Sequence, residues 1–337
     1  MTDLRAADTY ESSFRLWDVR ASVRTKPRRE LAGGPGQGGL FFPPEQVPVA
    51  AHALVRDRPR ADELPVHALY QYLHLTTVIE QTTVVPVATR ISLDQLPVEL
   101  PAAFRADAFK ICTDEAWHAQ FSYDFMTNVA AVTRVEPAAL MTPGYIKKVS
   151  RAREELDPSL RPLHDIFFAV VTETLISRLL SDIPKDHRLR PKVCEIVADH
   201  AEDEGRHHAY FRSLLHYLWP RISASERRLL GVQVPVLVRA FLEPDIGAVT
   251  RMLHAVGVPA GDIAPIVSDC YPVSGHDHDL GWAAAGTVRA FRDAGAFEEP
   301  QIADAFAGAG LYPVSGTRFP AREEETHQRP GRNECGI

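Results

Sequence analysis

One five-residue pattern, Asp-Glu-x-x-His, occurs twice in this chain and restricts its fold more than any other feature. The first copy spans residues 114–118, and the second spans 203–207, which begins 89 positions later. Both copies lie in segments whose apolar residues recur with the spacing of an α-helix. Because residues three apart share one face of a helix, the glutamate and the histidine of each copy converge. We therefore expect two helices that each present a carboxylate and an imidazole to a shared centre.

Two further predicted helices each carry one glutamate deep in an apolar run. Glu80 follows the segment 75–79, and Glu173 lies within 167–176. An ionised carboxylate in an apolar bundle core is costly unless it is paired or bound to a metal. Together with the repeat, these glutamates match the ligand pattern of a di-metal four-helix bundle. Two divalent ions would neutralise the four carboxylates, and mixed carboxylate and imidazole ligands favour iron or manganese.

The second copy of the repeat is preceded by an additional histidine. His200 lies four residues before Glu204 and shares its helix face with His207. On spacing alone it is either a third imidazole ligand or a core histidine bonded to a carbonyl. Asp114 and Asp203 directly precede the two ligand glutamates, so each is expected to reach the outer ring nitrogen of a ligand histidine. A single Glu-x-x-His is common on solvated helix faces, and the co-occurrence of four such segments favours the metal interpretation.

The pattern of apolar residues and prolines predicts an all-α fold. Long helices are expected at 65–85, 101–131, 162–183 and 191–219, and shorter ones at 225–243, 246–256 and 281–294. Prolines bound the long segments, and the first helix is expected to stop at Pro86. The fold class expected is a ferritin-like four-helix bundle core that carries the metal pair, with additional C-terminal helices packed against it.

Composition divides the chain into three parts. Residues 1–45 are expected to form an irregular N-terminal arm with a glycine-rich loop at 33–39. Residues 46–317 are expected to form a single helical domain, and 318–337 a disordered tail. The His-Asp tract at 276–279 is interpreted as a solvated loop rather than a second metal site.

Charge and cysteine content exclude several functional classes. The net charge of -7 and the absence of a basic stripe argue against nucleic acid binding. No apolar run approaches about 18 residues, and the first 20 residues lack the apolar stretch of a secretory signal. Four scattered cysteines without a CxxC pair argue against a disulfide framework and against a thiolate zinc site. We therefore expect a cytoplasmic protein that spans no membrane.

The intervals between the candidate ligands are similar to those of a known family. They are 35 residues from Glu80 to Glu115, 55 from His118 to Glu173 and 27 from Glu173 to His200. Over roughly residues 65–215 the chain resembles the p-aminobenzoate N-oxygenase (AurF-type) family of non-haem di-iron arylamine oxygenases. The additional histidine distinguishes this family from the usual ferritin-like sites. Carried over by position, the iron ligands are Glu80, Glu115, His118, Glu173, His200, Glu204 and His207.

The resemblance also implies how the ions are held and what they do. One iron takes Glu115 and His118, the other takes Glu173 with His200 and His207, and carboxylates bridge. It implies two iron ions that cycle between Fe2+ and Fe3+, with manganese as the ion expected on mis-metallation. O2 is the implied co-substrate, a reductase or ferredoxin the electron donor, and a homodimer the assembly. No catalytic residue is expected beyond the metal ligands.

The activity that this resemblance implies is oxidation of a primary, aryl amine to a hydroxylamine, nitroso or nitro product in antibiotic biosynthesis. The amine is either free or bound to a carrier protein. The alternative is a di-iron C-hydroxylase, desaturase or oxidative-cleavage enzyme that acts on another small acid or carrier-bound substrate. Radical generation at Tyr123 and iron storage are further rivals. Aromatic side chains near the ligand helices fit either an aryl pocket or ordinary core: Tyr70, Tyr72, Phe121, Tyr123, Phe125, Phe167 and Phe168.

Overall fold

The fold is all-α and ferritin-like, as expected. The structure is a computed structural model that describes residues 10–31, 38–272 and 276–311. The described residues contain no β-strand, only an isolated bridge between Leu40 and Leu189. The expected tail at 318–337 and most of the glycine-rich loop lie outside the described residues.

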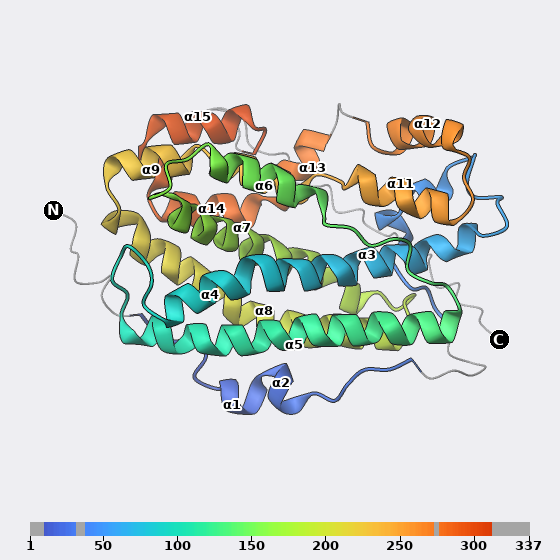
Figure 1. Cartoon of the computed structure of the whole chain (residues 1–337), viewed down its shortest axis with the longest axis horizontal. Helices are drawn as coiled ribbons and strands as arrows, with labels where there is room; N and C mark the ends of the chain where they lie inside the picture. Colours follow the sequence, from blue (N-terminus) through green and yellow to red (C-terminus); the bar gives the residue numbers. More distant parts are fainter. Residues whose placement is uncertain (1–9, 32–37, 273–275, 312–337) are drawn as a thin grey trace, which may run out of the picture.

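Four long helical runs form the bundle. They are α3 (Leu64–Ile79), which continues through η5 (Glu80–Val84) into α4 (Val85–Ser92), α5 (Ala102–Thr133), α7 (Arg161–Asp182) and α8 (Pro191–Leu218). Figure 1 shows α5 along the whole molecule beside α3 and α4, with α7 and α8 behind them. The expected positions of these helices are confirmed to within a few residues, except at the end of the first one.

The first bundle helix does not end at Pro86, so that prediction was wrong. The five residues from Glu80 to Val84 form a π-helical turn, and Pro86 lies in the first turn of α4. In this turn the Val85 amide donates to the Glu80 carbonyl, five residues back. The wider π turn accommodates a proline that would otherwise remove one bond from the α-helical ladder. The helix therefore continues, and Glu80 stands at the start of the altered turn.

Shorter helices cover the face of the bundle that is uppermost in Figure 1. They are α6 (Gly144–Glu154), α9 (Ala224–Gly231), α10 (Val234–Leu242), α11 (Ile246–Ala255), α12 (Ala260–Cys270), α13 (His276–Ala283), α14 (Ala285–Asp293) and α15 (Pro300–Gly308). Short 3-10 turns are η2 (Pro44–Gln46), η3 (Pro48–Ala51), η4 (Ala61–Glu63), η6 (Ile183–Lys185), η7 (Trp219–Arg221) and η8 (Ala296–Glu298). The apolar pattern did not predict α6, α12 or α15. The single helix expected at 225–243 is divided into α9 and α10. The backbone of the His-Asp tract at 276–279 is helical rather than a loop.

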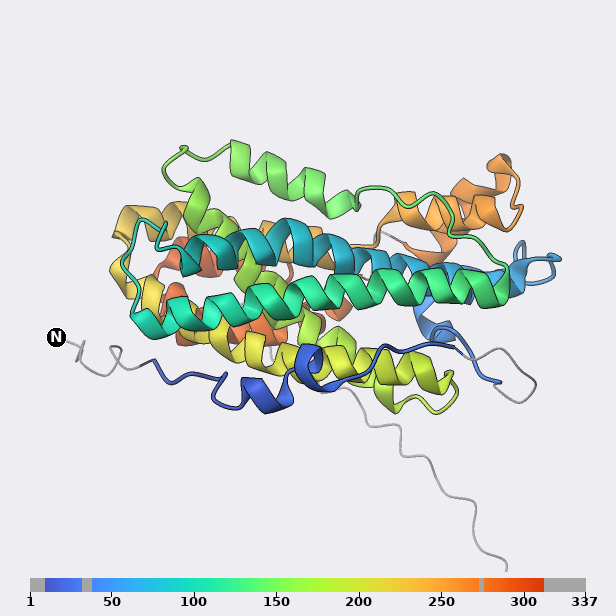
Figure 2. The same ribbon diagram turned by 60° about the horizontal axis from the view of Figure 1, so that its bottom comes forward.

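The N-terminal arm packs along the bundle. It contains two one-turn helices, α1 (Trp17–Arg20) and α2 (Ser22–Thr25). Figure 2 shows this segment lying against the edge formed by α5 and α8. The arm therefore belongs to the environment of the two helices that carry the Asp-Glu-x-x-His repeat.

Two apolar clusters fill the bundle on either side of a polar layer. On α5, Phe104 belongs to one cluster and Phe125 to the other, and the first copy of the repeat lies between them. On α8, Val197 and Phe211 flank the second copy in the same way. Burial of apolar surface at both ends thus stabilises a bundle whose middle holds ionisable groups.

No helix in the described part of the chain is long and apolar enough to span a membrane.

Candidate metal centre

All seven candidate ligands are buried in the polar layer of the bundle, with exposed fractions of at most 2%. Their side chains come from the four bundle runs: Glu80 from the π turn, Glu115 and His118 from α5, Glu173 from α7, and His200, Glu204 and His207 from α8. We call these seven residues the ligand cluster. Two overlapping sets of four, which share His118 and Glu204, have ligand atoms within 4.8 Å of one another.

Two glutamates lie centrally between the histidines. Glu115 Oε2 is 3.1 Å from His118 Nδ1, while its Oε1 is 3.0 Å from His207 Nδ1. Glu204 Oε1 is 3.4 Å from His118 Nδ1, 3.1 Å from His200 Nε2 and 3.3 Å from His207 Nδ1. Glu115 thus faces both sides of the cluster with its two oxygens, and Glu204 does so with Oε1, so both are placed to act as shared ligands.

The remaining two glutamates lie at opposite sides of the ligand cluster. Glu80 Oε1 is 3.2 Å from His200 Nε2, and its Oε2 is 3.5 Å from His118 Nδ1. Glu173 Oε2 is 3.9 Å from His207 Nδ1. Glu80 and Glu173 therefore have the placement of terminal ligands, one for each position of a metal pair.

The additional histidine lies on the side of the ligand cluster that the α5 histidine occupies. His200 lies beside His118, with ring centroids 4.5 Å apart, and both contact Glu80. It precedes His207 by seven residues on α8, which is about 10 Å along a helix axis. The spacing along α8 thus places His200 beside the α5 histidine, and the assignment of His200 and His207 to one ion stays a prediction.

The two repeat aspartates hold the histidines of the opposite helix. Asp114 Oδ2 is 3.2 Å from His207 Nε2, and Asp203 Oδ2 is 3.0 Å from His118 Nε2. Both candidate histidines, His118 and His207, therefore turn Nδ1 towards the other candidate ligands and Nε2 towards a buried aspartate. A carboxylate on the outer nitrogen fixes the tautomer and the orientation of a ligand imidazole.

The N-terminal arm supplies contacts that sequence reasoning missed. Trp17 Nε1 donates to Asp114 Oδ1 at 2.8 Å, and the Ser22 amide lies 3.2 Å from both Asp203 oxygens. Phe14 stacks near His207 with ring centroids 5.8 Å apart. Aromatic residues at 10, 14 and 17 were the signal in the sequence that could have indicated this packing.

The ligand cluster passes a test of fit to metal ions. Glu204 Oε2 is buried and makes no hydrogen bond to any described residue, while Glu80 Oε2 and His207 Nδ1 are buried and have only ion-pair contacts within the ligand cluster. Buried polar atoms without partners are rare, because each loses its hydration without compensation. Lone pairs of oxygen and nitrogen that converge in a dry centre are the ligands that iron and manganese accept.

The pKa shifts in the ligand cluster show how its charges depend on one another. Burial, together with the neighbouring Glu204 and Glu115, raises the pKa of Glu173 well above its ordinary value. Burial opposes ionisation of Glu204 as well, but the surrounding histidines bring its pKa well below the ordinary value. For His118 and His207, burial opposes the charge, yet the adjacent carboxylates raise both pKa values well above 6.5. Without metal, protons on these groups therefore balance the carboxylates.

The aromatic residues near the ligand helices divide by environment. Tyr70, Phe121, Phe125, Phe167 and Phe168 are buried in the apolar clusters. Tyr123 is 58% exposed on the outer face of α5, which is unfavourable for a buried radical site. The buried hydroxyl of Tyr72 makes no hydrogen bond in the described structure, and burial followed by repulsion from Glu204 raises its pKa.

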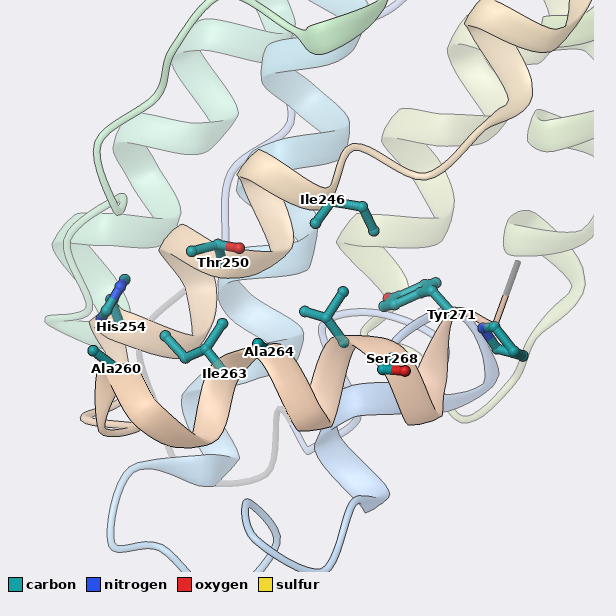
Figure 3. A pocket seen from close by; sticks show the side chains of 10 residues that line it. Ile246, Thr250, His254, Ala260, Ile263, Ala264, Ser268 and Tyr271 are labelled. Atoms are coloured by element: carbon teal, nitrogen blue, oxygen red, sulfur yellow. The ribbon is translucent and has the colours of Figure 1, made fainter. Parts of the chain in front are cut away.

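Two surface cavities are lined by residues outside the ligand cluster. One of about 570 Å³ lies between α11 and α12 and is lined mainly by apolar side chains such as Ile246 and Ile263 (Figure 3). A second, of about 330 Å³, borders the π turn at Thr83 and is lined by Arg90 and Arg153. No candidate ligand lines either cavity.

The chain matches a known family over most of its length. Residues 30–295 match the sequence model of a family described as p-aminobenzoate N-oxygenase AurF. A stretch of 115 residues is 28% identical to a 4-aminobenzoate N-oxygenase of Streptomyces thioluteus and covers 34% of each chain. The matched stretch thus spans about a third of the length of that relative.

Proposed function

The chain belongs to the p-aminobenzoate N-oxygenase AurF family, and from this premise we propose that it is a di-iron N-oxygenase of primary aryl amines. The observation that carries the proposal is the ligand cluster itself, with four carboxylates and three imidazoles closed within one buried layer. The curated relative is named for 4-aminobenzoate, so an aminobenzoate is the first substrate to test.

In this proposal each residue of the ligand cluster has a distinct role. Glu115 and Glu204 would bind both ions, because Glu115 contacts histidines on two sides through its two oxygens and Glu204 does so through Oε1. Glu80 and Glu173 are terminal ligands, and His118, His200 and His207 supply the nitrogen ligands. When bound, the iron pair supplies O2 activation with electrons from an external reductase or ferredoxin.

The protein contributes geometry and a dry environment. The apolar clusters on either side of the polar layer exclude water from it. Asp114 and Asp203 accept hydrogen bonds from the ligand histidines and hold their Nδ1 atoms towards the ions. The third histidine adds a neutral ligand beside the four carboxylates, so the layer gains a ligand without gaining negative charge.

The finer parts of the proposal concern the product and the partners. The nitrogen is taken to the hydroxylamine, nitroso or nitro level, and the amine is free or held by a carrier protein. Manganese is the expected substitute when iron is scarce. The protein acts in the cytoplasm as a homodimer within antibiotic biosynthesis.

The test combines metal analysis with product analysis. Purified protein loaded with Fe2+ is expected to hold two irons per chain and to oxidise the nitrogen of 4-aminobenzoate when given O2 and a chemical reductant. Mass spectrometry and chromatography against standards separate N-oxygenated from C-hydroxylated products. Glu204→Gln should lose metal and activity. Glu202→Gln, two residues earlier on the exposed side of α8, should retain both. Oxygen found only on carbon, or no bound metal in the wild type, would refute the proposal.

A further inference from the structure

Both oxygens of Asp114 are engaged, one by a ligand histidine and the other by the N-terminal arm. Oδ2 contacts His207 Nε2 at 3.2 Å, and Oδ1 accepts the Trp17 indole N–H at 2.8 Å. The two partners lie 93 and 97 residues from Asp114 in the chain. A carboxylate bound through one oxygen retains rotation about its Cβ–Cγ bond, whereas engagement of both oxygens fixes its plane. The direction of the His207 ring therefore depends on the arm.

The arm contacts this side of the centre at several points. Phe14 packs close to the face of His207, with an interplanar angle of 21°. The Ser22 amide donates to Asp203, which also pairs with Arg206 and holds His118. The arm thus contacts the outer groups of both ligand histidines.

We propose that Trp17 is a positioning residue for the metal centre, which fixes Asp114 and, through it, His207. The inference rests on the proposed metal function of the ligand cluster. A simpler role, in which Trp17 only attaches the arm to the bundle, makes a different prediction. The arm offers a matched control for that role, because Tyr10 Oη donates to Asp107 on the same helix, also at 2.8 Å. Asp107 contacts no member of the ligand cluster in the described hydrogen bonds and ion pairs.

Trp17→Phe removes the donor and keeps an aromatic ring, and Tyr10→Phe removes the control donor. Each variant and the wild type are loaded with Fe2+, and transfer to a colorimetric chelator is followed. In Trp17→Phe one of the two metal equivalents should leave about 3- to 10-fold faster, below the 10- to 100-fold typical of losing the carboxylate itself. The cobalt-loaded variant should show a changed visible spectrum for one equivalent. Tyr10→Phe should behave as wild type in both measurements.

A double-mutant cycle separates the two roles. If Trp17 acts through Asp114, combining Trp17→Phe with Asp114→Asn should release metal no faster than Asp114→Asn alone. Fully additive effects, equal release by Trp17→Phe and wild type, or equal acceleration in Tyr10→Phe would overturn the positioning role and leave the metal centre standing. A wild-type protein that binds no metal would overturn both.

A separate observation concerns the outer face of α5. Every exposed position on this face between residues 106 and 131 carries an uncharged side chain, and their spacing alternates between three and four as far as Thr127. They are Ala106, Phe109, Thr113, Ala116, Gln120, Tyr123, Thr127 and Ala131. In Figure 2 the green helix crosses the front of the molecule, and no other ribbon lies over it. A 3.5-residue repeat without charge is the pattern of a helix that packs against another helix.

We call these eight positions the α5 seam. The sizes of the side chains along the seam are complementary to those of a second copy of the seam that runs in the opposite direction. Two copies of α5 can pair antiparallel so that the residue numbers of facing positions add up to 236. In this register Phe109 faces Thr127 of the second copy. In the same register Tyr123 faces Thr113. Each exposed aromatic ring, 54% exposed for Phe109 and 58% for Tyr123, thereby meets a smaller side chain. Self-complementarity under a two-fold axis is what a symmetric dimer requires.

Charges beside the seam agree with this register. Lys110 and Asp124 lie on the same flank of the seam, and the antiparallel arrangement places Lys110 of one copy near Asp124 of the other. Ala116 and Gln120 pair across the centre, close to the axis. Resting on the homodimer of the proposed function, we infer that this face forms its interface, with the second copy of the chain bound through an antiparallel α5 pair.

The mass of the protein in solution tests this surface. Light scattering should give twice the chain mass of 37.4 kDa for the wild type. Ala116→Lys places like charges near the axis and should give a folded monomer by circular dichroism. Adding Gln120→Glu puts an acid opposite each new lysine and should restore the dimer. Ala139→Lys, in the exposed loop after α5, is the control. A monomeric wild type, or a dimer that tolerates Ala116→Lys, would refute the inference.

Discussion

Asp203 on α8 places its Oδ2 atom 3.0 Å from Nε2 of His118 on α5, and so holds a histidine that belongs to another helix. Asp114 on α5 does the same for His207 on α8. Each helix thus orients a candidate ligand histidine of the other helix, which couples the packing of α5 and α8 to the geometry of the candidate metal centre. An error in the packing of α5 on α8 would therefore misdirect both imidazoles.

Replacement of Asp203 should weaken metal binding without unfolding the bundle. Asp203→Asn keeps the size of the side chain but removes the charge that orients His118, and we expect metal affinity to fall about 10- to 100-fold. Competition with a chelator of known affinity measures the change. Asp199→Asn is the matched control, because Asp199 lies one turn earlier on α8 and pairs with Arg29 instead of a ligand. Equal losses in both variants would contradict the orienting role of Asp203.

Metal uptake should release protons. In the metal-free protein the pKa values of His118 and His207 are raised by their carboxylate partners, and that of Glu173 is raised by burial and by Glu204. Groups with raised pKa values hold their protons at neutral pH, and metal ions must displace them. Affinity should therefore increase as pH rises through the neutral range and fall on acidification.

Calorimetry in buffers of different ionisation enthalpy counts the protons released on metal binding. A binding reaction that releases no protons and does not depend on pH would show that these groups are already deprotonated without metal.

His200 should determine the metal occupancy of the position beside Glu80. Its Nε2 is 3.2 Å from Glu80 and 3.1 Å from Glu204, so His200→Ala removes a ligand from one position only. We expect the iron content to fall from two towards one per chain, as determined by elemental analysis. His74→Ala on α3, whose ring contacts the Met141 carbonyl and no candidate ligand, should leave the content unchanged. Two tightly bound irons in the His200 variant would assign this histidine to the core.

The ion pairs of Asp165, which lies outside the metal centre, should make the free energy of unfolding depend on pH in the acid range. Burial opposes the charge of Asp165, but His164, Arg153 and Arg90 lower its pKa to about 2. A lowered pKa contributes stability above the unfolded value near 3.9, and that stability is lost as pH falls from about 4 to about 2. Asp165→Asn should thus destabilise the protein by about 2 kcal/mol at neutral pH and by much less at pH 2.

Urea unfolding as a function of pH measures this difference. Asp94→Asn, which removes an exposed partner of Arg105, should cost less than about 1 kcal/mol. A constant difference between Asp165→Asn and wild type over the acid range would exclude a protonation effect.

The sequence alone predicted the helices that carry ligands, because a carboxylate deep in an apolar run requires a compensating charge, which metal ions supply. Glu80 and Glu173 were identifiable for this reason. The proximity of His200 to His118 was not identifiable, since a one-dimensional spacing does not show which neighbouring helix its ring approaches. The π turn was also missed, because Pro86 ordinarily ends a helix and only tertiary packing reveals that it does not. Contacts of the arm with Asp114 and Asp203 join residues about 100 to 180 positions apart, which local patterns do not encode.

Substitution by alanine should change the stability of the protein in opposite directions at two helical glycines. A methyl group added at Gly205, within the second copy of the repeat, would lie more than 4 Å from every atom outside its own stretch of helix, so Gly205→Ala should stabilise the protein by about 0.5 to 1 kcal/mol. Gly231 at the end of α9 is packed beneath Ile302, and an added methyl group would clash with its Cδ1 and Cγ1 atoms. Gly231→Ala should therefore destabilise by about 1 to 3 kcal/mol. Thermal and urea unfolding of both variants give the signs directly, and a stabilised Gly231→Ala would show that α15 moves away from α9 easily.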